Sequence, residues 1–178
     1  DIASAQKMSG DIEHILANTE HELKVGDTVN ARIDWDRRYR HMRMHTCLHL
    51  LCSLIDAPVT GGSVAADKGR LDFDLPESTL DKVALSAQLN ELVETNIPID
   101  VQWITDDELL AKPDLVRTMS VQPPTGQGKV RLINVEGVDL QPCGGTHLQS
   151  TGEIGGVFVR KIEKKGKQNR RVILAFND

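Results

Sequence analysis

The sequence predicts an α+β fold in which an antiparallel sheet packs against long helices. Two segments carry apolar residues at helical spacing, and several others alternate apolar and polar residues as strands do. Hydrophobic residues make up 39% of the 178 residues and aromatic residues only 3%, which predicts a core of aliphatic side chains. This length fits one ordinary domain, or one domain with a small appendage.

The first elements expected along the chain are two strands and a helix. Residues 11–16 (DIEHIL) and 27–34 (DTVNARID) alternate apolar and polar side chains, and Gly26 marks a turn before the second strand. A helix is expected from Asp36 to Ile55, because apolar or small residues recur there every three or four positions. Pro58 and a following Gly-Gly pair are expected to end it.

The middle of the chain predicts a strand, a helix and a second strand. Residues 69–75 (GRLDFDL) alternate strictly and predict a strand. The next segment, 78–81 (STLD), has the residue types that cap a helix, which should run to about Thr95. Residues 98–103 then predict another strand.

The last third predicts a short helix and three more strands. Thr105 and Glu108 have the spacing of a capping box, which begins a helix. Residues 130–135 (VRLINV) predict a strand, and residues 155–163 and 171–176 predict a hairpin that turns near Gly166. The segment most typical of a linker is 122–128 (QPPTGQG).

The net charge of −5 conceals two strongly basic runs. Residues 160–171 hold seven basic side chains and one acidic one, and residues 37–43 hold four Arg and no acid. Such runs on an acidic protein fit a surface that meets phosphate groups. The alternative is that both runs are only solvated edges of the fold.

The cysteine count, the apolar runs and the first residue predict where the protein is located and whether the chain is a fragment. Three Cys cannot pair completely, which predicts a reducing compartment, the cytoplasm, and favours a thiolate ligand over a disulfide framework. No apolar run approaches the ~20 residues of a membrane-spanning helix, and no secretion signal is expected. A chain that begins with Asp1 rather than Met is expected to be a fragment or a processed product.

Four side chains form a candidate metal site. His45 and His49 are spaced i, i+4 on the predicted helix, so both imidazoles should project from one helix face. Cys143 and His147 bracket a Gly-Gly turn far along the chain. Three nitrogen donors and one sulfur donor form a set that zinc takes in tetrahedral sites. If folding brings the two pairs together, this is where we place the function.

The same residue types also fit roles that involve no metal. A pair of His on an apolar helix face is more often packed in a core than bound to a metal. Cys52 shares that face, but it lies ~10 Å along the helix from His45, so Cys52 and Cys47 are better interpreted as core residues. A metalloprotease motif would need Glu next to the first His, where this chain has Thr46.

Whether a metal there is structural or catalytic is open on the sequence. Four protein ligands close a zinc site, which favours a structural ion. The site lacks the short Cys knuckles of zinc ribbons, and its surroundings are polar. If the site is catalytic, His147 is the ligand expected to exchange with water or substrate.

Four segments together resemble the editing domain of alanyl-tRNA synthetase and the freestanding alanyl-tRNA editing proteins of the AlaX type. They are RRYRHMRMHTCLHLL, VTGGSVAADKGRLDFDL, NIPID and QPCGGTHLQSTGEIG, within a resemblance that spans residues 11–176. It implies a two-layer editing domain over residues 36–178, preceded by a truncated small β-barrel segment over residues 1–35. His45, His49, Cys143 and His147 match the zinc positions of that family.

The resemblance also implies an activity. The chain is expected to deacylate mischarged tRNA-Ala, chiefly Ser-tRNA-Ala and also Gly-tRNA-Ala, by zinc-assisted ester hydrolysis. Because no aminoacylation motif and no nucleotide-binding segment is visible, a freestanding hydrolase is favoured. Two alternatives remain: a zinc-stabilised tRNA-binding module without chemistry, and a piece of a larger synthetase.

Roles follow for residues around the metal. A site that excludes alanine should bind the serine hydroxyl through buried polar partners, since each partner left unpaired costs ~1–3 kcal/mol. Candidates for this recognition are Thr46, Thr60 and Ser63, with Gln141 as a further substrate-binding residue; helix packing or turn formation is the alternative role of the three hydroxyls. Backbone N–H groups of Gly144 and Gly145 could hold the oxyanion, though both could serve only to make the turn. The expected tRNA-binding residues are Arg37, Arg38, Arg40, Lys161, Lys164, Lys165 and Arg170.

Overall fold

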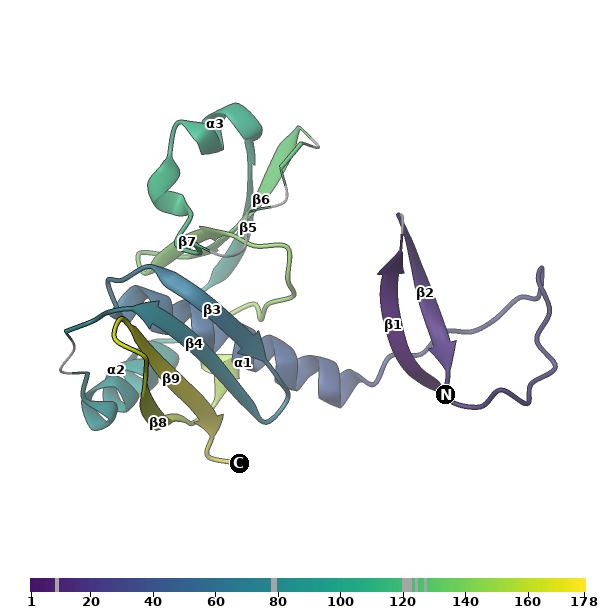
Figure 1. Ribbon diagram of the computed structural model, residues 1–178, viewed down its shortest axis with the longest axis horizontal. Helices are drawn as coiled ribbons and strands as arrows, with labels where there is room; N and C mark the ends of the chain where they lie inside the picture. The colour runs from purple at the N-terminus through teal and green to yellow at the C-terminus, as the bar shows by residue number, and fades with distance from the viewer. Residues whose placement is uncertain (9, 78–79, 120–122, 124, 127) are drawn as a thin grey trace. The chain divides into compact units, whose positions relative to one another are not determined.

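The computed structural model describes residues 1–8, 10–77, 80–119, 123, 125–126 and 128–178. It divides the chain into two compact units, residues 1–33 and residues 34–178 (Figure 1). The described part of the chain contains no helix both long and apolar enough to cross a membrane.

The first unit is an antiparallel pair, β1 (Ile2–Met8) and β2 (Asp11–Leu16). The strand expected at 11–16 is confirmed, whereas β1 was not predicted. The strand expected at 27–34 is wrong: these residues are irregular and exposed. An alternating segment becomes a strand only where a neighbour pairs with it, and the described residues provide none there. The described residues of this unit form no closed barrel.

The second unit is built on a four-stranded antiparallel sheet. Its strands are β3 (Val59–Val64), β4 (Lys68–Asp74), β8 (Val157–Lys165) and β9 (Asn169–Phe176), in the order β3-β4-β9-β8. The strand expected at 69–75 and the hairpin that turns at Gly166 are confirmed, and Gly166 has the positive φ of 72° that favours glycine. β3 was not predicted, because its Gly pair also fits a turn that ends a helix.

Two helices cover one face of this sheet (Figure 1). α1 (Trp35–Leu54) confirms the expected helix, and Asp34 caps it by accepting the backbone N–H of Arg37 at 3.0 Å. α2 (Lys82–Glu94) is capped by Asp81; the other expected capping residues, 78 and 79, lie outside the described residues. As predicted, the core between helices and sheet is mainly aliphatic, with Phe73 and Phe176 as its aromatic members.

A smaller three-stranded sheet completes the unit. Its order is β5 (Ile99–Thr105), β6 (Lys129–Val135) and β7 (Asp139–Pro142), all antiparallel. α3 (Asp106–Leu110) begins with the predicted capping box. Short 3₁₀ turns lie at Pro113–Leu115 and Thr151–Ile154. Of the linker expected at 122–128, residues 122, 124 and 127 lie outside the described residues, and the others form no helix or strand. β7 was not predicted, and it delivers the second half of the metal motif.

Candidate metal centre

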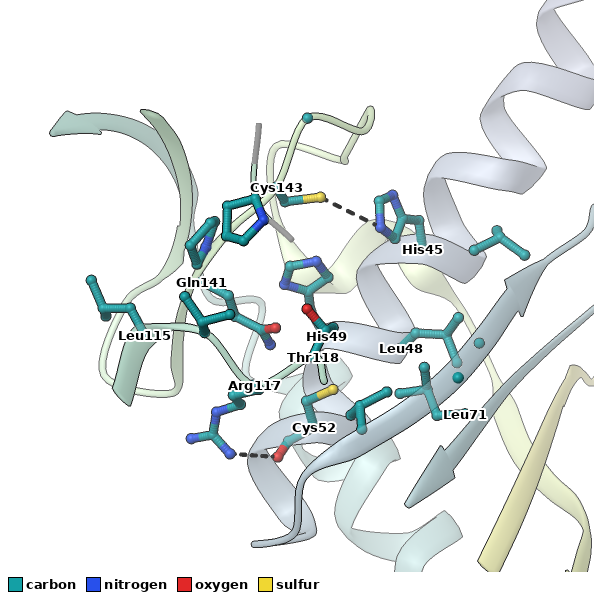
Figure 2. A pocket seen from close by; sticks show the side chains of 18 of the residues that line it. His45, Leu48, His49, Cys52, Leu71, Leu115, Arg117, Thr118, Gln141 and Cys143 are labelled. Atoms are coloured by element: carbon teal, nitrogen blue, oxygen red, sulfur yellow. Dashed lines mark hydrogen bonds between the residues drawn. The ribbon is translucent and has the colours of Figure 1, made fainter. Parts of the chain in front are cut away.

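The structure brings the four candidate ligands together. His45 and His49 lie one turn apart on α1, and Cys143 and His147 lie in the loop that follows β7. One donor atom from each residue falls within a group whose members all lie within 4.8 Å of one another. Figure 2 shows His45 and Cys143 pointing toward each other from the two sides. The group could therefore hold a metal ion.

Two distances from the Cys143 thiol fit a tetrahedral ion. Sγ of Cys143 lies 3.6 Å from Nε2 of His45 and 3.4 Å from Nε2 of His147. Bonds of about 2.0–2.3 Å in a tetrahedral site place the donor atoms roughly 3.3–3.8 Å apart. The donor set and these two distances match the expectation for zinc, and all four donor atoms lie within 4.8 Å of one another.

The second nitrogen of two imidazoles is held by a neighbour. Nδ1 of His49 lies 3.0 Å from Oδ2 of Asp139, and Nδ1 of His147 lies 3.1 Å from Oγ1 of Thr46. These contacts leave the Nε2 atoms for the centre. A hydrogen bond of this kind orients a metal-binding imidazole and sets its tautomer. Thr46 is fully buried and also accepts the backbone N–H of Leu148 at 3.3 Å, so it supports ligands rather than facing a cavity.

Sequence reasoning missed Asp139. It is almost completely buried, and Nε2 of Gln141 donates to both of its oxygens at 3.0 and 2.9 Å. A buried carboxylate needs such partners, because an unpaired charge in the interior is costly. The available signal was an acidic residue between apolar neighbours in the segment VDLQP, close to the second half of the motif.

The electrostatics of the centre favour a thiolate. Burial raises the pKa of Cys143, but hydrogen bonds from His147, His45 and His49 outweigh it and bring the pKa to about 3. Burial lowers the pKa of His147 to about 4, so this ring is neutral, as a metal ligand must be. Burial also lowers the pKa of His49, but the hydrogen bonds to Asp139 and Cys143 prevail and raise it to about 9. A metal ion bound there would replace that proton.

The two glycines of the ligand loop have different surroundings. A Cβ atom on Gly145 would overlap Cε1 of His45 and lie 2.6 Å from its Nδ1, whereas a Cβ atom on Gly144 would meet nothing within 4 Å. The N–H of Gly145 donates to Sγ of Cys143 at 3.4 Å, so it is directed at the ligand. Gly144 instead lines the neighbouring cavity. Glycine at position 145 is therefore required for close approach.

Arg131 holds the ligand loop against β6 and was also missed by sequence reasoning. Its Nη1 donates to the carbonyl oxygens of Cys143 at 2.9 Å and of Gly145 at 2.7 Å. Cys143 returns a backbone hydrogen bond to the carbonyl of Arg131 at 3.0 Å. The loop that carries two ligands is thus tied to a strand at several points.

A cavity of about 330 Å³ opens beside the centre (Figure 2). His45, His49 and Cys143 form part of its wall, and Ser63 and Gln141 contribute polar groups. Much of the remaining wall is apolar and includes Leu48, Cys52, Val59, Leu71, Leu115 and Val116. Cys52 and Cys47 are buried, as predicted.

The expected recognition residue Thr60 is not among the residues that line this cavity. Its hydroxyl donates to the carbonyl oxygen of Asp72 at 3.1 Å and lies 3.3 Å from Oδ1 of Asn169. The structure therefore directs this hydroxyl toward neighbouring strands. Of the four expected recognition and substrate-binding residues, Ser63 and Gln141 line the cavity, and Thr46 and Thr60 do not.

The expected tRNA-binding residues are spread over several surroundings. Arg37 and Arg38 are exposed on the first turn of α1, and Lys164 is exposed on β8. The side chains of the other four contact neighbours. Arg40 donates to the Ala66 carbonyl and to Asp178, and Arg170 donates to the carbonyls of Pro76 and Asn169. Lys161 and Lys165 both pair with Glu163. Lys161 also lines a second cavity.

Comparison with known proteins points in one direction. Residues 130–173 match the family described as the threonyl and alanyl tRNA synthetase second additional domain. The alanyl-tRNA editing protein AlaX-M of Methanosarcina acetivorans is 37% identical in an alignment that covers 100% of this chain and 76% of the relative. The protein of the same name from Saccharolobus solfataricus is 33% identical, with 92% and 70% covered. A segment of the alanine–tRNA ligase of Saccharolobus islandicus is 28% identical and aligns with 92% of this chain and 19% of the ligase.

Proposed function

This chain belongs to the alanyl-tRNA editing proteins of the AlaX type, and from that premise we propose that it deacylates mischarged tRNA-Ala. The reaction is hydrolysis of the ester between an incorrect amino acid and the 3′ end of the tRNA. The observation that carries the proposal is the convergence of four metal-binding donor atoms at the wall of a cavity. The proposed location is the cytoplasm, whose reducing conditions suit the three free cysteines.

We propose that zinc is held by His45, His49, Cys143 and His147. The donor set and the 3.4 and 3.6 Å separations from the thiolate support this. When bound, zinc supplies Lewis acidity beside the ester. Of the four ligands, His147 is proposed to exchange; its Nδ1 contacts a hydroxyl, whereas that of His49 contacts a buried carboxylate.

The cavity is proposed to hold the amino acid of the substrate. Ser63 and Gln141 line the cavity, as do Arg117 and Thr118, and polar groups in the wall that could pair with a serine hydroxyl support Ser-tRNA-Ala as the main substrate. Alanine would leave such groups unpaired, at a cost of about 1–3 kcal/mol each. Gly-tRNA-Ala is proposed as the second substrate. The contacts of Thr60 support a role in joining strands rather than in recognition.

Two expected catalytic roles take a more specific form. Thr46 would act as a positioning residue through His147, since its hydroxyl bonds that ring. Gly144, which lines the cavity, is the better candidate to donate a backbone N–H to the oxyanion, because the N–H of Gly145 is directed at Cys143. The exposed cations Arg37, Arg38 and Lys164 are proposed to meet tRNA phosphates.

The test is deacylation by the purified chain. Ser-tRNA-Ala should be hydrolysed and correctly charged Ala-tRNA-Ala should be spared, with activity lost on zinc removal and restored by zinc. The closed set of four protein ligands favours one rival, a zinc-stabilised tRNA-binding module without chemistry. A zinc-loaded chain that binds tRNA-Ala but leaves Ser-tRNA-Ala intact would establish that rival instead.

A further inference from the structure

A second cavity, of about 440 Å³, lies on the four-stranded sheet and is strongly basic. Four of the seven residues that line it are cationic and none is acidic; the lining is Ser63, Lys68, Gly69, Arg70, Arg160, Lys161 and Ile173. Only Arg160 and Lys161 belong to the basic runs visible in the sequence. We call this surface the basic groove.

Strand register accounts for the way residues distant in sequence form the groove. Arg70 on β4 lies opposite Ser63 on β3 and Ile173 on β9, and Ile173 lies opposite Lys161 on β8. These residues therefore make one row across all four strands. Lys68 lies two positions before Arg70 on β4, so its side chain is on the same face. That face is opposite the one that Leu71 and Phe73 bury against the helices.

An irregularity in β8 brings two adjacent cations to the groove. The register shifts between Val159 and Lys161, so Arg160 is an extra residue in the ladder. In a regular strand Arg160 and Lys161 would point to opposite faces, and one of them would enter the core. The bulge leaves both exposed. The fold thus accommodates a second positive charge where alternation would have required an apolar residue.

Two of the four cations form ion pairs with acidic side chains, and two form none among the described residues. Nη1 of Arg70 pairs with Asp72 at 2.7 Å, and Nζ of Lys161 pairs with Glu163 at 2.6 Å. Among the described residues, Lys68 and Arg160 have neither an ion pair nor a side-chain hydrogen bond. Asp72 is also neutralised by Arg171 at 2.7 Å. The groove therefore retains net positive charge without a protein counterion, as a phosphate-binding surface requires.

The groove adjoins the cavity of the metal centre. Ser63 lines both cavities, and it lies on β3, the terminal strand of the sheet. Gly61 and Gly62 precede it and also line the cavity of the metal centre. A single-stranded chain lying in the groove could pass over this strand, where two glycines present no side chain, and place its end beside the centre.

We propose that the basic groove binds the backbone phosphates of the single-stranded 3′ end of the tRNA, immediately before the nucleotide that carries the amino acid. This inference rests on the proposed function and names the surface that delivers the substrate to it. Lys68 and Arg160 each meet a phosphate. The groove reads no base, since cations in contact with phosphates carry no sequence information.

The test compares two double variants of equal charge. Lys68→Ala/Arg160→Ala removes the unpaired cations of the groove, and Lys82→Ala/Lys112→Ala removes two exposed lysines on other elements. The first measurement is the Kd for uncharged tRNA-Ala over a series of salt concentrations. The groove variant should bind at least about tenfold more weakly, and its salt slope should fall by about 1.4, since each single-strand phosphate contact contributes about 0.7. The lysine control should bind as the unchanged chain does.

The second measurement is hydrolysis of Ser-tRNA-Ala and of 3′-O-seryl adenosine, which has no phosphate. The groove variant should show a higher KM and unchanged kcat on the tRNA, and should hydrolyse the adenosine ester normally. The proposal is overturned if the groove variant binds tRNA as tightly as the unchanged chain, or if both double variants lose the same tRNA affinity. The proposal is also overturned if the groove variant loses as much activity on the adenosine ester as on Ser-tRNA-Ala. A chain that hydrolyses neither substrate refutes the deacylase proposal alone, because the binding measurement still decides the groove.

Discussion

Nδ1 of His49 lies 3.0 Å from Oδ2 of Asp139, and this contact joins the C-terminal half of α1 to the first residue of β7. Both side chains are almost fully buried, with exposed fractions of 8% and 1%. The same strand leads directly to Cys143. The pair therefore couples the two halves of the candidate metal centre as well as orienting one imidazole.

Replacing Asp139 should weaken metal binding more than folding. Asp139→Ala removes the acceptor for Nδ1 of His49, and loss of such a partner typically lowers metal affinity about 10–100-fold. Competition with a chromophoric zinc chelator measures this affinity. Asp139→Asn, which retains an acceptor oxygen, should fall between the alanine variant and the unchanged chain. Equal zinc affinity in all three proteins would show that the contact does not support the site.

The same substitution should weaken zinc binding at one loop glycine and leave it unchanged at the other. Gly145→Ala places a methyl group against His45, so the ring must move and zinc affinity should fall at least about tenfold, a change of about 1.4 kcal/mol. Gly144→Ala has open space and is the matched control for zinc binding. Zinc content after dialysis and chelator competition distinguish the two. If both variants retain zinc equally, the close approach at position 145 is not limiting.

Removing the metal should leave the fold largely in place. The principal core contains residues from both helices and the four-stranded sheet, and none of the candidate ligands belongs to it. Cys143→Ala should lose zinc and deacylation while keeping its far-ultraviolet circular dichroism and a cooperative thermal transition. A control treated with chelator should behave in the same way. Unfolding of either protein at room temperature would instead make the metal a structural requirement.

The ion pair between Asp72 and Arg171 predicts a pH-dependent contribution to stability. Hydrogen bonds from Arg171 hold the pKa of Asp72 below its ordinary value. The carboxylate is therefore favoured by folding, and its contribution is present above the unfolded-state pKa of ~3.9 and is lost as the pH falls through the lower folded-state value. At neutral pH, Asp72→Asn should destabilise the protein by about 1.5–3 kcal/mol, the range for a hydrogen bond to a charged group.

Urea unfolding at a series of pH values measures this contribution. The difference between Asp72→Asn and the unchanged chain should be constant above about pH 5 and should shrink below the unfolded-state pKa of ~3.9. Asp74→Asn, on the same strand, is the control. Within the described residues, Asp74 forms no ion pair. If this difference in unfolding free energy is as large at the lowest pH as at neutral pH, it arises from packing rather than from charge.

Local patterns in the sequence were sufficient for most elements of the second unit. The helical spacing over 36–55, the capping box at Thr105 and Glu108, and the strict alternation over 69–75 each depend on neighbours a few positions away. The same logic failed at 27–34, because alternation makes a strand only where a partner is available. It also missed β3, in which the Gly pair that suggested a turn is part of the sheet.

The sequence by itself determined which side chains could bind a metal, because the residue types and the i, i+4 spacing are local properties. Only the tertiary structure decided what surrounds them. Asp139 behind His49 and the contact of Gly145 with His45 depend on how β7 and the loop after it pack against α1, and the row that joins Arg70 to Lys161 depends on strand register. Register is set by contacts between segments far apart in the chain, so no local pattern specifies it.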